Sequence, residues 1–114
     1  MNIKIKNNIN DLIIDSVRPE ELKELKELQA RYDSRKDFYK KAFTGVYYWN
    51  NGKQPALYLK SYDTIVACIF VNQLRIYGWF SQTTARHIKE FARQNDFDYN
   101  FTKKEMQETF VLSK

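Results

Sequence analysis

The sequence is short of the residues that crosslink small proteins or hold metals. Its 114 residues include a single cysteine, Cys68, and a single histidine, His87. One cysteine excludes an intrachain disulfide, and one histidine excludes a metal site built from several histidines. Because Cys68 lies within an apolar run, we expect it in the core as a small hydrophobic side chain. The sequence therefore predicts no metal, no cofactor and a reducing, cytoplasmic environment.

Long apolar runs and flexible linkers are also missing. No run approaches the roughly 18–20 apolar residues of a membrane span, so we expect no contact with a membrane. The first residues, MNIKIKNNINDLIIDS, interrupt their apolar side chains with Asn and Asp, unlike a signal peptide. Three glycines and two prolines leave little material for linkers. We predict a single domain over residues 1–114, in which residues 1–17 are the candidate for a loosely attached segment.

Aromatic and basic residues are what the chain has in quantity. Eight phenylalanines, eight tyrosines and two tryptophans can supply a core, because each ring buries on the order of 150–250 Å². The formal net charge is +5 at pH 7. Lysine and arginine side chains release counterions from phosphate backbones, so this charge is a mild bias toward polyanionic partners.

Helix signals follow Ser16. Pro19 suits the first turn of a helix, where its missing N–H would have no partner in any case, and two glutamates follow it. Four apolar side chains then recur at spacings of three, three and four, as on one side of a helix: Leu22, Leu25, Leu28 and Tyr32. The pattern predicts an N-terminal helix that packs on the core. Alternatively, the same stripe could pair two copies of the chain in a homodimer.

A four-stranded antiparallel meander is predicted next. Its strands are segments rich in aromatic and β-branched residues: 38–49, 56–60, 65–71 and 74–80. Asn50-Asn51-Gly52 joins the first two, because a tight hairpin turn needs positive φ angles that Asn and Gly adopt readily. The third segment, IVACIFV, has no polar residue and indicates a central strand buried on both faces.

The clearest change of period lies in residues 74–95, where a strand gives way to an amphipathic helix capped by Ser81, Thr83 or Thr84. The apolar face of this helix consists of Ala85, Ile88, Phe91 and Ala92, and its basic stripe consists of Arg86, Lys89 and Arg93. A capping box at Thr102 and Glu105 starts a short last helix that is predicted through about Phe110. The predicted fold is α+β: an N-terminal helix, a four-stranded antiparallel meander, a helix packed on one sheet face and a short C-terminal helix.

The basic stripe of Arg86, Lys89 and Arg93 is the best candidate for a binding surface. A second basic stretch precedes the sheet and consists of Arg35, Lys36, Lys40 and Lys41. Exposed aromatic residues beside such cations can stack on bases, which is how proteins hold single strands. An ordinary solvated helix face would carry the same charges, so the stripe alone does not decide between the two.

Tyr62, Asp63 and His87 complete the candidate binding residues. Tyr62 and Asp63 occupy a turn, where they either bond nearby backbone or face a partner. His87 borders the apolar helix face and suits a hydrogen bond back to the sheet. A catalytic set of Ser81, His87 and Asp63 is conceivable, but no glycines of a nucleophile elbow surround Ser81. We therefore assign no catalytic residue.

Two stretches carry a resemblance: Tyr62-Asp63-Thr64-Ile65-Val66-Ala67 and Ser81-Gln82-Thr83-Thr84-Ala85-Arg86-His87-Ile88-Lys89-Glu90-Phe91. They resemble a small family of phage and prophage proteins of unknown function with an "SYDT-VA … S-TT-RHI-EF" signature. An earlier "S-K-FY-KA" element of that family is matched by Ser34, Lys36, Phe38, Tyr39, Lys41 and Ala42. The resemblance implies a small accessory gene on a mobile element in a bacterium. Such genes often encode nucleic-acid-handling proteins or inhibitors of host defence, including anti-CRISPR proteins.

These observations favour binding over catalysis. The first hypothesis is a phage-encoded accessory protein in the bacterial cytoplasm that occludes a host protein or ribonucleoprotein, such as a CRISPR nuclease. The second is direct binding of DNA or RNA through the basic stripe. The third, a small hydrolase or nuclease using His87, is supported least, because no second catalytic group is evident.

Overall fold

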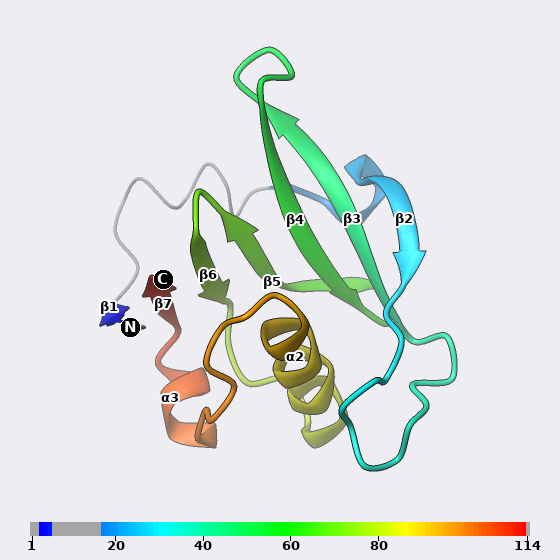
Figure 1. Cartoon of the computed structure of the whole chain (residues 1–114), viewed down its shortest axis with the longest axis vertical. Helices are drawn as coiled ribbons and strands as arrows, with labels where there is room; N and C mark the ends of the chain where they lie inside the picture. The colour runs from blue at the N-terminus through cyan, green and yellow to red at the C-terminus, as the bar shows by residue number, and fades with distance from the viewer. Residues whose placement is uncertain (1–2, 6–16, 114) are drawn as a thin grey trace.

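The computed structural model describes the backbone of residues 3–5 and the whole of residues 17–113. An antiparallel sheet of seven strands, in the order β1-β7-β6-β5-β4-β3-β2, carries the long helix α2 against one face (Figure 1). The strands are β1 (Ile3–Ile5), β2 (Lys23–Glu27), β3 (Ala42–Trp49), β4 (Gln54–Ser61), β5 (Thr64–Phe70), β6 (Gln73–Ile76) and β7 (Phe110–Ser113). The helical segments are the 3₁₀ turn η1 (Pro19–Glu21), α2 (Gln82–Gln94) and α3 (Lys103–Gln107). Most of the predicted loose segment, residues 6–16, lies outside the described residues.

Strands β3 to β6 form a meander at the positions of the four predicted strands, although β3 begins at Ala42 rather than Phe38 and β6 ends at Ile76 rather than Phe80. The turn between β3 and β4 has positive φ angles of 53° and 54° at its two asparagines and 85° at Gly52, as its sequence predicts. Strand β5 is buried on both faces. Ala67 packs beneath α2 and Cys68 packs in the opposite cluster, and both are 0% exposed.

The N-terminal helix predicted from Ser16 is wrong. Among the residues described there, the turn η1 is followed by β2 at the sheet edge (Figure 1). Strand β2 is irregular, because Glu24 has a positive φ of 54° and the pairing with β3 shifts between Lys23 and Lys26. An extra residue in a strand resets its two-residue alternation. Leucines spaced by three residues therefore fit this bulged strand as well as they fit a helix.

The four side chains of the stripe that suggested a homodimer do not lie on one surface. Leu22 is buried on the sheet face away from α2, whereas Leu28 is buried in the core beneath α2. Leu25 and Tyr32 are exposed, at 49% and 53%. A close approach of β2 to β3 explains the burial of Leu22, because a Cβ on Gly45 would lie 2.8 Å from the Leu22 Cβ. The geometric basis for the predicted dimer is therefore absent.

The four-stranded sheet was also an underestimate, because β2 extends it at one edge and β7 and β1 extend it at the other. The last helix was predicted through about Phe110, but α3 ends at Gln107, and Thr109 has a positive φ of 50°. Phe110, Val111 and Leu112 are all buried. A strand with neighbours on both edges buries successive apolar side chains on two faces, which a short surface helix cannot do.

Two hydrophobic clusters lie on opposite faces of the sheet. The larger one contains Ile88 and Phe91 of α2 together with side chains from β4, β6, α3 and β7. The smaller one surrounds Tyr58, with half-buried aromatic side chains such as Trp49 and Tyr77 at its margin. The aromatic residues of the sheet thus serve mainly as core, which removes most of them as stacking platforms for bases.

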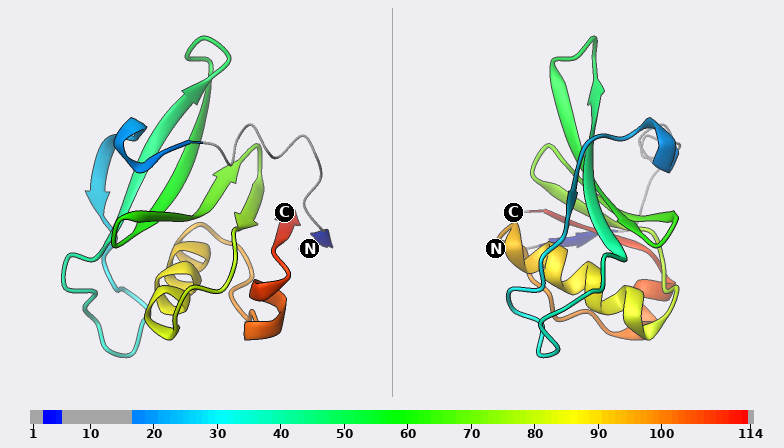
Figure 2. Two further views of the ribbon diagram at one scale, coloured as in Figure 1. Left: turned by 180° about the vertical axis from the view of Figure 1, so that it is seen from behind. Right: turned by 90° about the vertical axis from the view of Figure 1, so that its right-hand side faces the viewer.

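The segment 28–41, which joins β2 to β3, leaves the sheet and lies beside α2 in both views of Figure 2. The segment 95–102 follows α2 and returns toward α3 (Figure 1). These two connections lie next to the solvent-facing side of α2, and they build the candidate site. Within the described residues, no helix has the length and apolar character needed to span a membrane.

Candidate functional site

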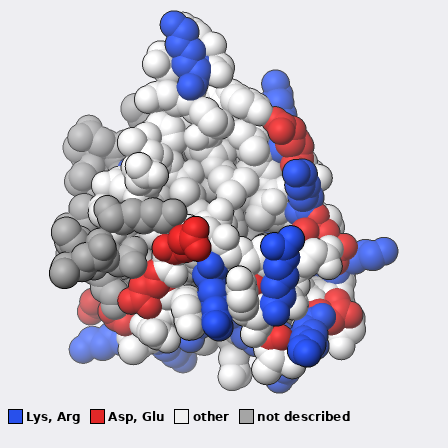
Figure 3. Space-filling view, viewed as in Figure 1, with Lys and Arg blue, Asp and Glu red and all other residues white. Residues whose placement is uncertain are grey.

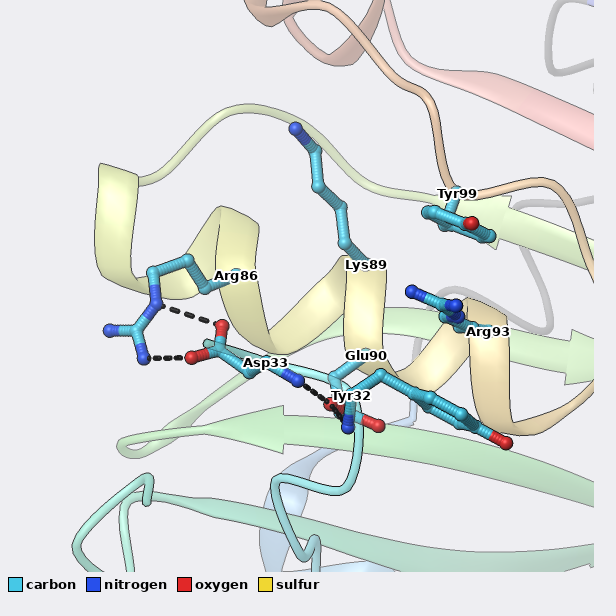
Figure 4. Close-up of a pocket in the computed structure, with 7 residues that line it drawn as sticks. All are labelled: Tyr32, Asp33, Arg86, Lys89, Glu90, Arg93 and Tyr99. Carbon is cyan, nitrogen blue, oxygen red and sulfur yellow. Dashed lines mark hydrogen bonds and ion pairs between the residues drawn. The ribbon is translucent and has the colours of Figure 1, made fainter. Parts of the chain in front are cut away.

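The candidate site is built on the polar face of α2. Ser81 starts the helix, because its Oγ accepts a hydrogen bond from the backbone N–H of Thr84 at 3.0 Å. Burial of the opposite face against the sheet then turns Arg86, Lys89 and Arg93 outward, as their spacing predicts. They line a pocket of about 160 Å³ together with Tyr32, Asp33, Glu90 and Tyr99 (Figure 4). We call this pocket the α2 cleft.

Glu90 attaches the 28–41 segment to the helix. Its Oε1 accepts hydrogen bonds from the backbone N–H groups of Tyr32 and Asp33, at 2.9 and 2.8 Å (Figure 4). Its Oε2 accepts a hydrogen bond from the Gln94 side chain at 2.6 Å. The side chain is only 3% exposed, and these three donors satisfy the buried carboxylate. Glu90 therefore has a positioning role and is not available to a ligand.

Arg86 is occupied by Asp33. The two side chains form a bidentate pair, with Nε to Oδ2 at 2.9 Å and Nη2 to Oδ1 at 2.6 Å (Figure 4). The pair is largely buried, with 22% of the Arg86 side chain and 10% of the Asp33 side chain exposed. These bonds lower the pKa of Asp33 and raise the pKa of Arg86 from their ordinary values. The predicted stripe therefore presents two uncommitted cations rather than three.

Arg93 is held in a stack. Its guanidinium carbon lies 4.4 Å from the ring centre of Tyr32 and 4.5 Å from that of Tyr99. Cation–π contacts on both faces keep the guanidinium in place and leave its N–H edge open. Neither Arg93 nor Lys89, one turn earlier, has an acidic partner among residues 17–113. In Figure 4 the Lys89 and Arg93 side chains lie on the same side of α2 as the Tyr99 ring.

The second basic stretch lies at one end of the α2 cleft. Arg35 follows Asp33 closely, and its backbone N–H donates to Asp33 Oδ1 at 2.9 Å. All four of its predicted binding residues are exposed: Arg35, Lys36, Lys40 and Lys41. None of them lines the pocket. The other end is acidic, because Asp96 and Asp98 follow α2 in the segment that supplies Tyr99.

Figure 3 shows this asymmetry. Blue side chains predominate around α2 and the 28–41 segment, with some red ones among them, and red side chains gather beside the segment that follows α2.

His87 lies in the core, away from the cleft. It is 0% exposed, and its Nδ1 is 2.7 Å from the Ser61 Oγ, which in turn is 2.9 Å from the Thr84 Oγ1. Its ring meets Phe38 edge-on at 4.6 Å. Burial, with a smaller contribution from the Arg86 charge, lowers the pKa of His87 to about 4. His87 is therefore neutral near pH 7 and lies next to the sheet residue Ser61, but its burial shows that its prediction as a binding residue is wrong.

The conceivable catalytic set is not assembled. Ser81 caps α2, and His87 bonds to Ser61 instead. Asp63 lies exposed in the turn between β4 and β5, next to Tyr62, which is 47% exposed. No group of three or more His, Cys, Asp or Glu side chains that could hold a metal ion occurs within residues 17–113.

The model of one protein family matches residues 26–108 of this chain. The chain belongs to DUF8033, a family of unknown function. The DUF8033 region runs from β2 to just beyond α3 and contains every residue of the α2 cleft. No curated protein and no solved structure matches the chain.

Sequence reasoning missed four cleft residues of this DUF8033 protein: Tyr32, Asp33, Glu90 and Tyr99. Tyr32 belongs to the predicted leucine stripe, and the helical pattern of 82–94 gives Glu90 no binding role. The separation of Asp33 and Arg86, 53 positions, explains why no local pattern revealed the pair. A glutamate inside an otherwise basic helix face was the one available signal that a segment docks there.

Proposed function

We propose that this DUF8033 protein is a non-enzymatic binding protein whose α2 cleft holds single-stranded nucleic acid. The observation that carries the proposal is Arg93, which is stacked between Tyr32 and Tyr99 beside Lys89. The acids lining the cleft are already satisfied, Asp33 by Arg86 and Glu90 by three donors.

The chemistry of the cleft fits a phosphate next to a base. An arginine edge donates paired hydrogen bonds to phosphate oxygens, and a lysine adds a point charge. Tyrosine rings stack on bases, and bases are open to stacking in a single strand but not in a duplex. Arg35, Lys36, Lys40 and Lys41 extend the positive surface from one end of the cleft.

Catalysis finds no comparable support. His87, the histidine of the chain, is buried and has a pKa lowered to about 4. A general base acts best when its pKa lies near the working pH and when it reaches the substrate. A binding function therefore agrees better with the geometry than a hydrolase or nuclease does.

The test is fluorescence anisotropy with a labelled single-stranded oligonucleotide over a range of salt concentrations. Affinity is expected to fall steeply with salt, because the cations displace counterions from phosphates. Lys89→Ala and Arg93→Ala should each weaken binding and flatten the salt dependence. Lys53→Ala is the matched control, since Lys53 is exposed in the β3–β4 turn at the opposite end of the molecule (Figure 1). If all three variants lose the same affinity for the oligonucleotide, the α2 cleft is not its binding site.

The second candidate is an inhibitor of a host defence factor, which the phage-protein resemblance implies. Two exposed tyrosines favour a protein or ribonucleoprotein partner: Tyr39 is 73% exposed and Tyr62 is 47% exposed. Both influence the pKa of Arg86 and so lie near one end of the cleft. Tyrosine is common among the residues that dominate protein interfaces. Asp63, beside Tyr62, is exposed and could contribute to the same surface.

A pull-down from lysate of a bacterial host, with and without nuclease treatment, separates the two candidates. The inhibitor requires one partner protein that survives nuclease and is lost with Tyr39→Ala or Tyr62→Ala. Partners that disappear with nuclease, and with Arg93→Ala, would favour nucleic acid instead.

A further inference from the structure

We propose that the α2 cleft recognises the terminal phosphate of a nucleic-acid strand, a phosphate monoester, in preference to an internal phosphodiester. This inference rests on the proposed nucleic-acid binding and specifies which part of the strand enters the cleft. It follows from the number of open cations in the cleft and from the opposite charges at its two ends.

The charge of the open cations in the pocket matches a terminal phosphate. Lys89 and Arg93 are the two cleft cations without an acidic partner among residues 17–113, whereas Arg86 is paired with Asp33. A phosphate monoester carries about −1.5 to −2 charges near neutral pH, while an internal phosphodiester carries one. Two cations that line one pocket and have no acidic partner among the described residues therefore stabilise a terminal phosphate more than an internal one.

The Arg93 guanidinium is held in a fixed position. Tyr32 and Tyr99 fix the Arg93 guanidinium from both faces, so its N–H edge is in place before a ligand arrives. A guanidinium whose paired N–H donors are fixed in this way suits an acceptor group with several free oxygens. A terminal phosphate has three such oxygens, and an internal phosphodiester has only two that do not bridge to sugars. The pocket volume of about 160 Å³ suits a small group of this kind.

The two ends of the cleft carry opposite charges. At the Asp33 end residues 35–41 carry four exposed cations and one exposed acid, Asp37, and at the Tyr99 end lie Asp96 and Asp98 (Figure 3). A strand that passed straight through would run over these acids and be repelled. A strand that ends in the cleft needs only the basic side. The charge distribution thus favours a strand terminus over a continuous track.

The experiment compares oligonucleotides of about twelve nucleotides, a length within the usual site size for single strands, in three forms. One has a 5′-phosphate, one a 3′-phosphate, and one has hydroxyl groups at both ends. One of the two phosphorylated strands is expected to bind at least about tenfold more tightly than the hydroxyl form, which corresponds to about 1.4 kcal/mol. Inorganic phosphate is added separately as a competitor and should compete only weakly.

Variants assign the preference to named side chains. Lys89→Ala and Arg93→Gln should abolish it, and Lys53→Ala should leave it intact. If Arg93→Gln does not fold, Lys89→Ala still tests the preference, because Lys89 forms no hydrogen bond or ion pair with residues 17–113. Asp96→Asn combined with Asp98→Asn should strengthen binding of the hydroxyl form and so reduce the preference.

The outcomes separate this inference from the function on which it rests. Equal, salt-sensitive affinity for all three strands would overturn terminal recognition and leave nucleic-acid binding standing. Absence of binding to every strand would overturn both. Displacement of the strand by inorganic phosphate at concentrations similar to that of the strand would show a site for free phosphate and overturn strand-end recognition.

Discussion

Acidification from about pH 7.5 to about pH 5 is expected to destabilise this protein through His87. The imidazole is 0% exposed, and its Nε2 has no hydrogen-bond partner among the described residues. A second proton would place a buried positive charge near Arg86. The fold therefore lowers the pKa of His87 from 6.5 to about 4.

The sign and size of the effect follow from this shift. Between pH 6.5 and about pH 4 the unfolded chain binds a proton on His87 that the folded chain does not. Stability is therefore complete above the unfolded pKa and falls as the pH decreases toward the folded pKa. The loss is about 2 kcal/mol at pH 5 relative to pH 7.5, and about 3 kcal/mol when fully developed.

Urea unfolding followed by circular dichroism at several pH values measures this loss. The comparison is with His87→Asn, whose amide can keep a hydrogen bond to Ser61 but does not titrate. The carboxylates titrate in both proteins, so the difference between the two curves isolates His87. If the free energy of unfolding changes with pH in parallel for wild type and His87→Asn, the predicted effect of His87 is refuted.

The imidazole can also be followed directly, because the chain has one histidine. Its proton resonance should not shift between about pH 7.5 and pH 5.5 if the pKa is lowered as stated.

Three substitutions test the contacts that build the site and the sheet, each through the free energy of unfolding in urea. Asp33→Asn removes the charge that pairs with Arg86 in a largely buried position, and should destabilise the fold by about 1–3 kcal/mol. Gly45→Ala should cost about 1–3 kcal/mol, because the new Cβ would lie 2.8 Å from the Leu22 Cβ. Ser81→Ala removes the N-cap of α2 and should cost about 1 kcal/mol.

Each substitution has a control or a contradicting result. Asp96→Asn removes an exposed acid and should leave stability nearly unchanged, so an equal loss would show that Asp33 acts only through net charge. Ser34→Ala is the control for Ser81→Ala, since Ser34 is exposed and caps no helix. Wild-type stability in Gly45→Ala would contradict the close contact between β2 and β3.

Local sequence patterns were sufficient to predict the β3–β4 turn, the buried strand β5 and the helix α2. Asn50-Asn51-Gly52 specified the β3–β4 turn, and the apolar run at 65–71 specified a strand buried on both faces. Ser81 and the period of 74–95 specified α2 and the side on which its cations lie. These features depend on neighbours within a few residues, so the sequence alone reveals them.

Both errors in the fold occurred where local and tertiary preferences compete. Leucines spaced by three residues favoured a helix, but β3 offered an edge for pairing and Gly45 left room for Leu22. The capping box at Thr102 did start α3, yet Phe110 to Leu112 gained more burial as a strand between β6 and β1. Tertiary packing overrides weak helix propensity in such segments.

The sequence by itself determined that Arg86, Lys89 and Arg93 share one face of a helix, because that face follows from helical geometry. Only the tertiary structure decided which of these charges are open to a ligand. Asp33, 53 positions away, pairs with Arg86, and Tyr32 joins Tyr99 around Arg93. Such contacts form between segments brought together by burial of the sheet and helix. They therefore cannot be predicted from the spacing of residues along the chain.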